Sequence, residues 1–109
     1  MNAINDYRHQ NGLSDVHTER YTCDFAKTRS QEIVANFNHD GFTKRMESKT
    51  LPYPGYTQIT ENIAMTSDYH QVVQMWINSP GHAENMRKDT PSVCVASSGD
   101  YYAYEGWRP

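Results

Sequence analysis

Two histidines and one glutamate are the residues of this sequence best suited to chemistry: His39, Glu61 and His82, on three separate stretches of the chain. Two neutral imidazoles and a carboxylate suit a divalent metal such as zinc with an open coordination position. They also suit general acid–base hydrolysis, in which Glu61 polarises a histidine that activates water. Without catalysis, they could line a cleft for a peptide, lipid or small molecule, or form a polar network that holds helices to a sheet. No nucleophile with a matching base accompanies them.

The element that positions His82 is a predicted helix from Ser79 to about Lys88. Ser79 is suited to cap this helix, and Pro80 fits the first turn, where no backbone N–H is needed. His82 then lies near the positive end of the helix dipole, which disfavours the imidazolium form. We therefore expect a neutral His82 and a Ser79 hydroxyl already engaged as a cap.

His39 is expected to follow a long helix, and Glu61 to lie on a strand. The long helix is predicted from about Thr18 to Asn38, because apolar and small residues recur there at intervals of three and four. This stripe comprises Cys23, Ala26, Ser30, Ile33 and Phe37, and the opposite face, which we expect to be exposed, comprises Asp24, Lys27, Arg29 and Glu32. Residues 57–65 are rich in Thr and Ile and read as a strand.

The remaining stretches predict further helices and a hairpin. A helix is expected over residues 2–11, a short helical turn over 43–49, a loop over 51–56 and a helix from about Asp68. In that last helix Trp76 belongs to a stripe that we assign to the core. Residues 93–96 and 101–104 read as the two strands of a hairpin. The element order predicts a single α+β domain over residues 1–109, with a small antiparallel or mixed sheet covered by helices.

Composition narrows the classes of partner and compartment. The 109 residues carry a formal net charge of −3 with no basic block, so nucleic acid is not expected as a partner. No apolar run approaches the length needed to cross a bilayer. Cys23 and Cys94 lack metal-site spacing and could form one disulfide or remain two buried thiols. No signal peptide is recognisable, which fits a cytoplasmic protein or one whose signal has been removed.

Several short motifs, taken together, resemble the CAP superfamily, also called the SCP domain. They are Asn5-x-x-Arg8, Gly12-Leu13, Ala26-x-x-x-Ser30, Phe37-x-His39, Glu61-Asn62-Ile63-Ala64 and Trp76-x-x-Ser79-Pro80-Gly81-His82-x-x-Asn85. Each motif alone is weak, but their order and spacing are specific and cover nearly the whole chain. The Ser-Pro-Gly-His form is similar to the short bacterial branch of the superfamily.

The resemblance implies a three-layer α-β-α sandwich and a secreted, extracellular protein, which we expect to be a monomer. Family members share a cleft with two histidines and, in many, two glutamates; His39, Glu61 and His82 match three of these four, and Ser79 stands where the second glutamate would be. The expected function is a binding or interaction module with a cleft that could hold a divalent metal such as zinc. The alternative is a metal-assisted, peptidase-like hydrolase that uses the same three residues.

Overall fold

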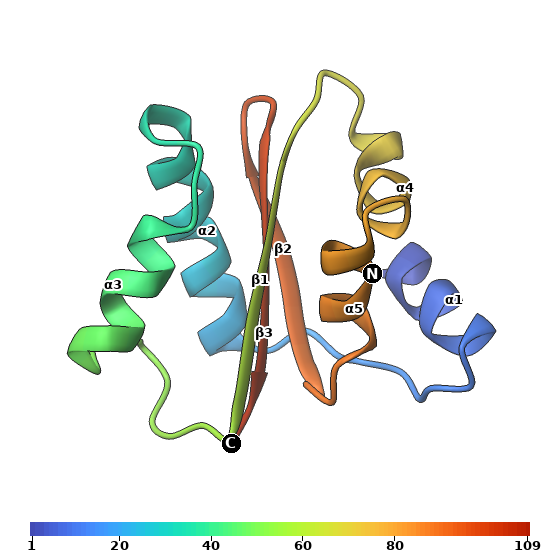
Figure 1. The fold of residues 1–109 in the computed structure, drawn as a ribbon, viewed down its shortest axis with the longest axis horizontal. Helices are drawn as coiled ribbons and strands as arrows, with labels where there is room; N and C mark the ends of the chain where they lie inside the picture. The colour runs from blue at the N-terminus through green and yellow to red at the C-terminus, as the bar shows by residue number, and fades with distance from the viewer.

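The protein is a three-layer sandwich with a sheet between two layers of helices, in a computed structural model that describes residues 1–109 (Figure 1). One layer comprises α2 (Arg20–Ala35) and α3 (Asp40–Ser48). The other comprises α1 (Asn2–Gln10), α4 (Val72–Ile77), which follows a 3₁₀ turn (Tyr69–Gln71), and α5 (Pro80–Arg87). The strands are β1 (Gln58–Met65), β2 (Ser92–Ser98) and β3 (Tyr101–Arg108). The predicted α-β-α architecture is confirmed.

The sheet is antiparallel throughout, with β3 at its centre in the order β1-β3-β2. β2 and β3 form the predicted hairpin, which turns at Gly99 with φ +59°, a left-handed value that favours glycine. β1 pairs with β3 from Gln58↔Arg108 to Met65↔Tyr101. β1 is therefore an edge strand, with one side bonded to β3 and the other side free.

Each face of the sheet buries its own apolar core. Between the sheet and α1, α4 and α5 lies a cluster that includes Trp76 and Tyr104, which are 1% and 0% exposed. On the opposite face, α2 packs against the sheet through Phe25 and Ile33. Because β1 contributes alternate side chains to both faces, it can bring residues of the two helical layers together at its free edge.

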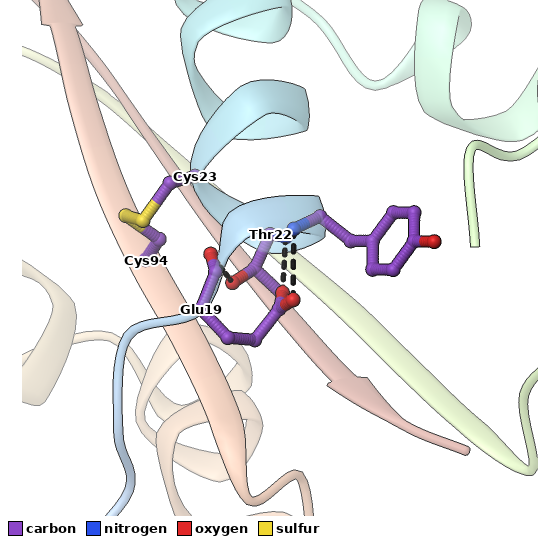
Figure 2. Close-up of a disulfide and its surroundings, with 5 residues drawn as sticks. Glu19, Thr22, Cys23 and Cys94 are labelled. Carbon is purple, nitrogen blue, oxygen red and sulfur yellow. Dashed lines mark hydrogen bonds between the residues drawn. A yellow bond between two sulfur atoms is a disulfide. The ribbon is translucent and has the colours of Figure 1, made fainter. Parts of the chain in front are cut away.

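A disulfide fastens α2 to the sheet. Cys23 and Cys94 are bonded, with their Cα atoms 4.9 Å apart (Figure 2). The sequence left a disulfide and two free thiols as alternatives, and the structure has the disulfide. Beside it, the Glu19 carboxylate accepts hydrogen bonds from the backbone N–H groups of Tyr21 and Thr22 and so caps α2 (Figure 2).

The long helix differs from its prediction in extent and in its buried face. It spans Arg20–Ala35 rather than residues 18–38, so Phe37 lies outside it and is 49% exposed instead of joining the core stripe. Arg29, expected on the solvent-facing side, is 1% exposed because its guanidinium has a buried carboxylate as a partner. The short turn predicted at 43–49 is a full helix, α3.

Candidate functional site

His39 reaches the free edge of β1 from the start of α3. It was expected at the end of the long helix, but α2 has already ended and His39 is the N-cap residue of α3. Its ring is 48% exposed, and its Nδ1 lies 2.8 Å from Oε2 of Glu61. This bond fixes the ring while Nε2 has no hydrogen-bond partner in the protein and is open to a ligand.

Glu61 is held by a buried arginine as well as by His39. Arg29 donates from Nε to Oε1 at 2.7 Å and from its NH2 nitrogen to Oε2 at 3.1 Å, and both side chains are 1% exposed. Burial alone would raise the pKa of Glu61, but the hydrogen bonds from His39 and Arg29 outweigh it and lower the pKa below its usual value. Glu61 is therefore ionised at neutral pH, and the proton of its bond with His39 lies on Nδ1.

A second carboxyl group, that of Glu105, lies across the sheet from Glu61. The two residues are cross-strand partners in the register of β1 and β3. Glu105 is fully buried, and neither of its oxygens has a hydrogen-bond partner. Burial, and then the negative charge of Glu61, raises the pKa of Glu105 well above the usual value. The raised pKa favours the protonated, neutral form of Glu105, so the carboxylates that balance Arg29 are Glu61 and Glu32, whose Oε1 accepts from Arg29 at 2.8 Å.

His82 reaches the same edge from the first turn of α5, in the opposite helical layer. Ser79 is the N-cap residue as predicted, but its hydroxyl makes no capping bond and instead lies 2.9 Å from Nδ1 of His82. The ring is partly buried, and burial, followed by the charge of His39, lowers its pKa. The expectation of a neutral His82 is therefore supported, with burial as the main physical cause.

Two asparagines attach α5 to β1 through hydrogen bonds to the backbone. Asn62 donates to the carbonyl of His82 at 3.0 Å, which fixes the turn that carries this histidine. Asn85 donates to the carbonyl of Glu61 at 3.1 Å and to the side-chain oxygen of Asn62 at 2.8 Å. The position of His82 relative to Glu61 is thus set by side-chain bonds to the backbone.

The two histidines share one groove along the free edge of β1. It has a volume of about 500 Å³ and is lined by His39, Asn38, Ser79 and His82. Its other lining residues are apolar: Phe37, Ile63, Ala64, Met65, Met75 and Trp76. A second hollow of about 350 Å³ also has His39 in its lining, together with Ile59, Glu61 and Asn85, among others. We call these two hollows together the β1 groove.

The three predicted site residues do gather around β1, but Glu61 does not fit the role of a metal ligand. Both of its oxygens are bonded to Arg29, and its side chain is 1% exposed. No group of three or more His, Cys, Asp and Glu side chains is arranged to hold a metal ion. A metal at this site would have only the two imidazoles as protein ligands. The three-ligand zinc site therefore stays a prediction that this donor set does not favour.

Arg29 and Glu105 are the site residues that the sequence did not single out. Arg29 is one of several charged residues on α2, and its main partner is 32 positions away. Glu105 faces Glu61 only through the strand register. Glu105 follows three tyrosines and an alanine in β3, and the residues around it are buried. A glutamate within such a mostly apolar strand is unusual, and this is the one feature of the sequence that could have identified Glu105 as a site residue.

The chain matches the family model described as the cysteine-rich secretory protein family, CAP, over residues 1–105. It is similar to an extracellular protein containing an SCP domain from Bacillus anthracis, with 25% identity and a TM-score of 0.82, over 97% of this chain and 38% of that one. It also resembles a cysteine-rich secretory protein from Staphylococcus aureus, with 16% identity and a TM-score of 0.80, over 99% of this chain and 37% of that one.

An outer surface protein from Borrelia burgdorferi is a third structural neighbour, with 18% identity and a TM-score of 0.79, over 98% of this chain and 87% of that one. The chain thus spans less than two fifths of the length of the first two neighbours. No curated protein matches the sequence. None of the helices is long and apolar enough to cross a membrane. The family match over residues 1–105, together with the sandwich and the placement of the motifs along β1, leads to one conclusion: the chain belongs to the CAP family.

Proposed function

We propose that the protein is an extracellular binding module whose β1 groove takes an extended, largely apolar ligand. One observation carries this proposal: a groove with six apolar lining residues runs between two imidazoles, each with an unpartnered Nε2, from opposite helical layers. Apolar walls with a few fixed polar groups are typical of ligand sites. The second hollow, which shares His39, lengthens the groove, which favours an extended ligand over a compact one.

The extracellular location draws on two further observations. The Cys23–Cys94 disulfide is typical of proteins from oxidising compartments. Two of the structural neighbours are described as an extracellular protein and an outer surface protein. Metal-assisted hydrolysis ranks second, because it needs a carboxylate that is free to bind the metal. Glu61 is committed to Arg29 on both oxygens.

Binding of 1-anilinonaphthalene-8-sulfonate, a fluorescent probe with an apolar ring system, tests the proposal. Met75 lines the groove and is 39% exposed, whereas Met46 is 41% exposed on α3 and lies outside the groove. Met75→Asp should abolish most of the fluorescence increase, and the matched control Met46→Asp should retain it. Equal losses in the two variants, or no binding by the wild type, would remove the support for an apolar binding groove.

A further inference from the structure

Lys88 is a cation of the β1 groove that has no charged partner in the protein. It is half-buried and lines the same hollow as His39 and Glu61. The negative charge of Glu61 in this hollow is already taken, because its carboxylate is bonded to Arg29 and to His39. No carboxylate lies within ion-pair distance of Lys88. Its ammonium group is therefore free to bind an anion that enters the groove.

The backbone of Lys88 is held in place by a buried arginine. Lys88 is the C-cap residue of α5, and its carbonyl accepts from the guanidinium of Arg8 at 2.9 Å. Arg8, which is 5% exposed, also donates to the carbonyl of Met86 at 2.9 Å. These bonds fix the end of α5 on one side of β1, with α3 on the other side (Figure 1). A lysine at a helix end can also act only on the helix dipole, an alternative that the test below distinguishes.

The adjacent edge of β1 adds hydrogen-bond donors. The backbone N–H of Thr66 bonds to β3, and antiparallel ladders alternate, so Glu61 and Ile63 direct their N–H and C=O groups away from β3. The carbonyl of Glu61 already accepts from Asn85 at 3.1 Å. The carbonyl of Ile63 accepts from the indole of Trp76 at 3.0 Å. No side chain accepts from either N–H, so both remain available to a ligand.

Together these groups favour an anion carried by an apolar molecule. An oxyanion could accept from Lys88 and from the N–H of Glu61, which line one hollow. His39 adds a donor at Nε2 when its ring is protonated. The other hollow, which also has His39 in its lining, supplies six apolar residues. A peptide strand would bring its own N–H groups to carbonyls that are already occupied, at a cost that a hydrocarbon chain avoids.

We propose that Lys88 and the N–H of Glu61 form an oxyanion subsite, and that the ligand of the β1 groove is an aliphatic carboxylate. This inference rests on the proposed function and names the ligand class of the same groove. The carboxylate lies in the hollow with Lys88, and the hydrocarbon chain lies along the apolar wall that includes Met65 and Met75.

Isothermal calorimetry with two amphiphiles tests the proposal. Decanoate and decyltrimethylammonium have chains of similar length and opposite charges, and both are used below their micelle concentrations. We expect decanoate to bind about fivefold more tightly, the ratio that one partly exposed ion pair supplies. Lys88→Met keeps the apolar stem without the charge and should abolish this preference, whereas Lys88→Arg should retain it. Lys27→Met, at an exposed lysine of α2 outside the groove, is the matched control and should keep the wild-type preference.

The outcomes separate this inference from the proposed function. Equal binding of the two amphiphiles, or a preference for decanoate that survives Lys88→Met, would overturn the oxyanion subsite while leaving the groove as a binding site. Absence of decanoate binding would also overturn the subsite, and failure of the fluorescent probe as well would overturn the proposed function. Amide spectra of the wild type give a second readout: decanoate should shift the amide proton of Glu61 downfield, and an unshifted amide would contradict the proposal.

Discussion

Replacing the buried acid Glu105 by glutamine should change how stability depends on pH. Glu105 is fully buried next to Glu61, and its pKa is raised well above the usual value by burial and by that neighbouring charge. In the unfolded chain a glutamate ionises near pH 4.3. Above that pH the native state therefore holds one proton that the unfolded state has released, and stability falls as pH rises.

The slope of the free energy of unfolding against pH follows from this difference of one bound proton. The free energy of unfolding should fall by about 1.4 kcal/mol per pH unit from this group, until Glu105 itself ionises in the native state. Glutamine has no proton to retain, so the stability of Glu105→Gln relative to the wild type should grow by about 1.4 kcal/mol between pH 5 and pH 6. Glu61 contributes no slope here, because its lowered pKa places its titration below this window.

Urea unfolding followed by circular dichroism at pH 5, 6 and 7 measures this difference. His82 contributes a slope of the opposite sign: its lowered pKa makes stability rise with pH, as the unfolded histidine loses its proton near pH 6.5. This contribution is common to the wild type and the variant, so it cancels when the two are compared. Glu47→Gln, at an exposed glutamate of α3, is the control and should follow the wild type. A difference that stays constant from pH 5 to pH 7 would show that native Glu105 does not retain its proton.

Three further predictions concern other parts of the molecule. Calorimetry should detect no micromolar zinc binding, because the protein offers only the imidazoles of His39 and His82; binding lost in the double alanine variant would refute this. Removing the Cys23–Cys94 disulfide by substitution of both cysteines with alanine should lower the free energy of unfolding by about 4 kcal/mol, measured in urea, since the bond closes a loop with a sequence separation of 71. Gly41→Ala should cost about 1–3 kcal/mol in the same assay, because a Cβ there would collide with a buried guanidinium, and a neutral result would contradict that packing.

Local patterns were sufficient to predict most elements of this fold. The Ser79-Pro80 start of α5 and the hairpin around Gly99 depend on residues close in sequence, and both are present as predicted. The predicted end of the long helix was wrong. Phe37 continues the helical stripe in the sequence, but α2 ends at Ala35 and Phe37 lines the β1 groove. A periodic pattern alone does not distinguish a core residue from an apolar residue that lines a binding site.

The histidines of the candidate site could be predicted from the sequence, but the buried position of Arg29 and the protonation state of Glu105 could not. His39, Glu61 and His82 were identified because they belong to the motifs by which the sequence resembles the family. Arg29 was assigned to the exposed face because charged residues are seldom buried unless paired, and its partner comes from a strand distant in sequence. The neutral state of Glu105 depends on strand register and burial, neither of which local sequence determines.

The central claim, that the β1 groove is the binding site, is tested most directly by titrating the ¹⁵N-labelled protein with 1-anilinonaphthalene-8-sulfonate and mapping the amide shifts. The largest shifts are expected at Met65, Met75 and His82, which line the groove. A competing hollow of about 530 Å³ beside α3 has no apolar side chain in its lining, which includes Lys44 and Arg45, whose charges could attract the sulfonate. Shifts confined to Lys44 and Arg45 would contradict the account.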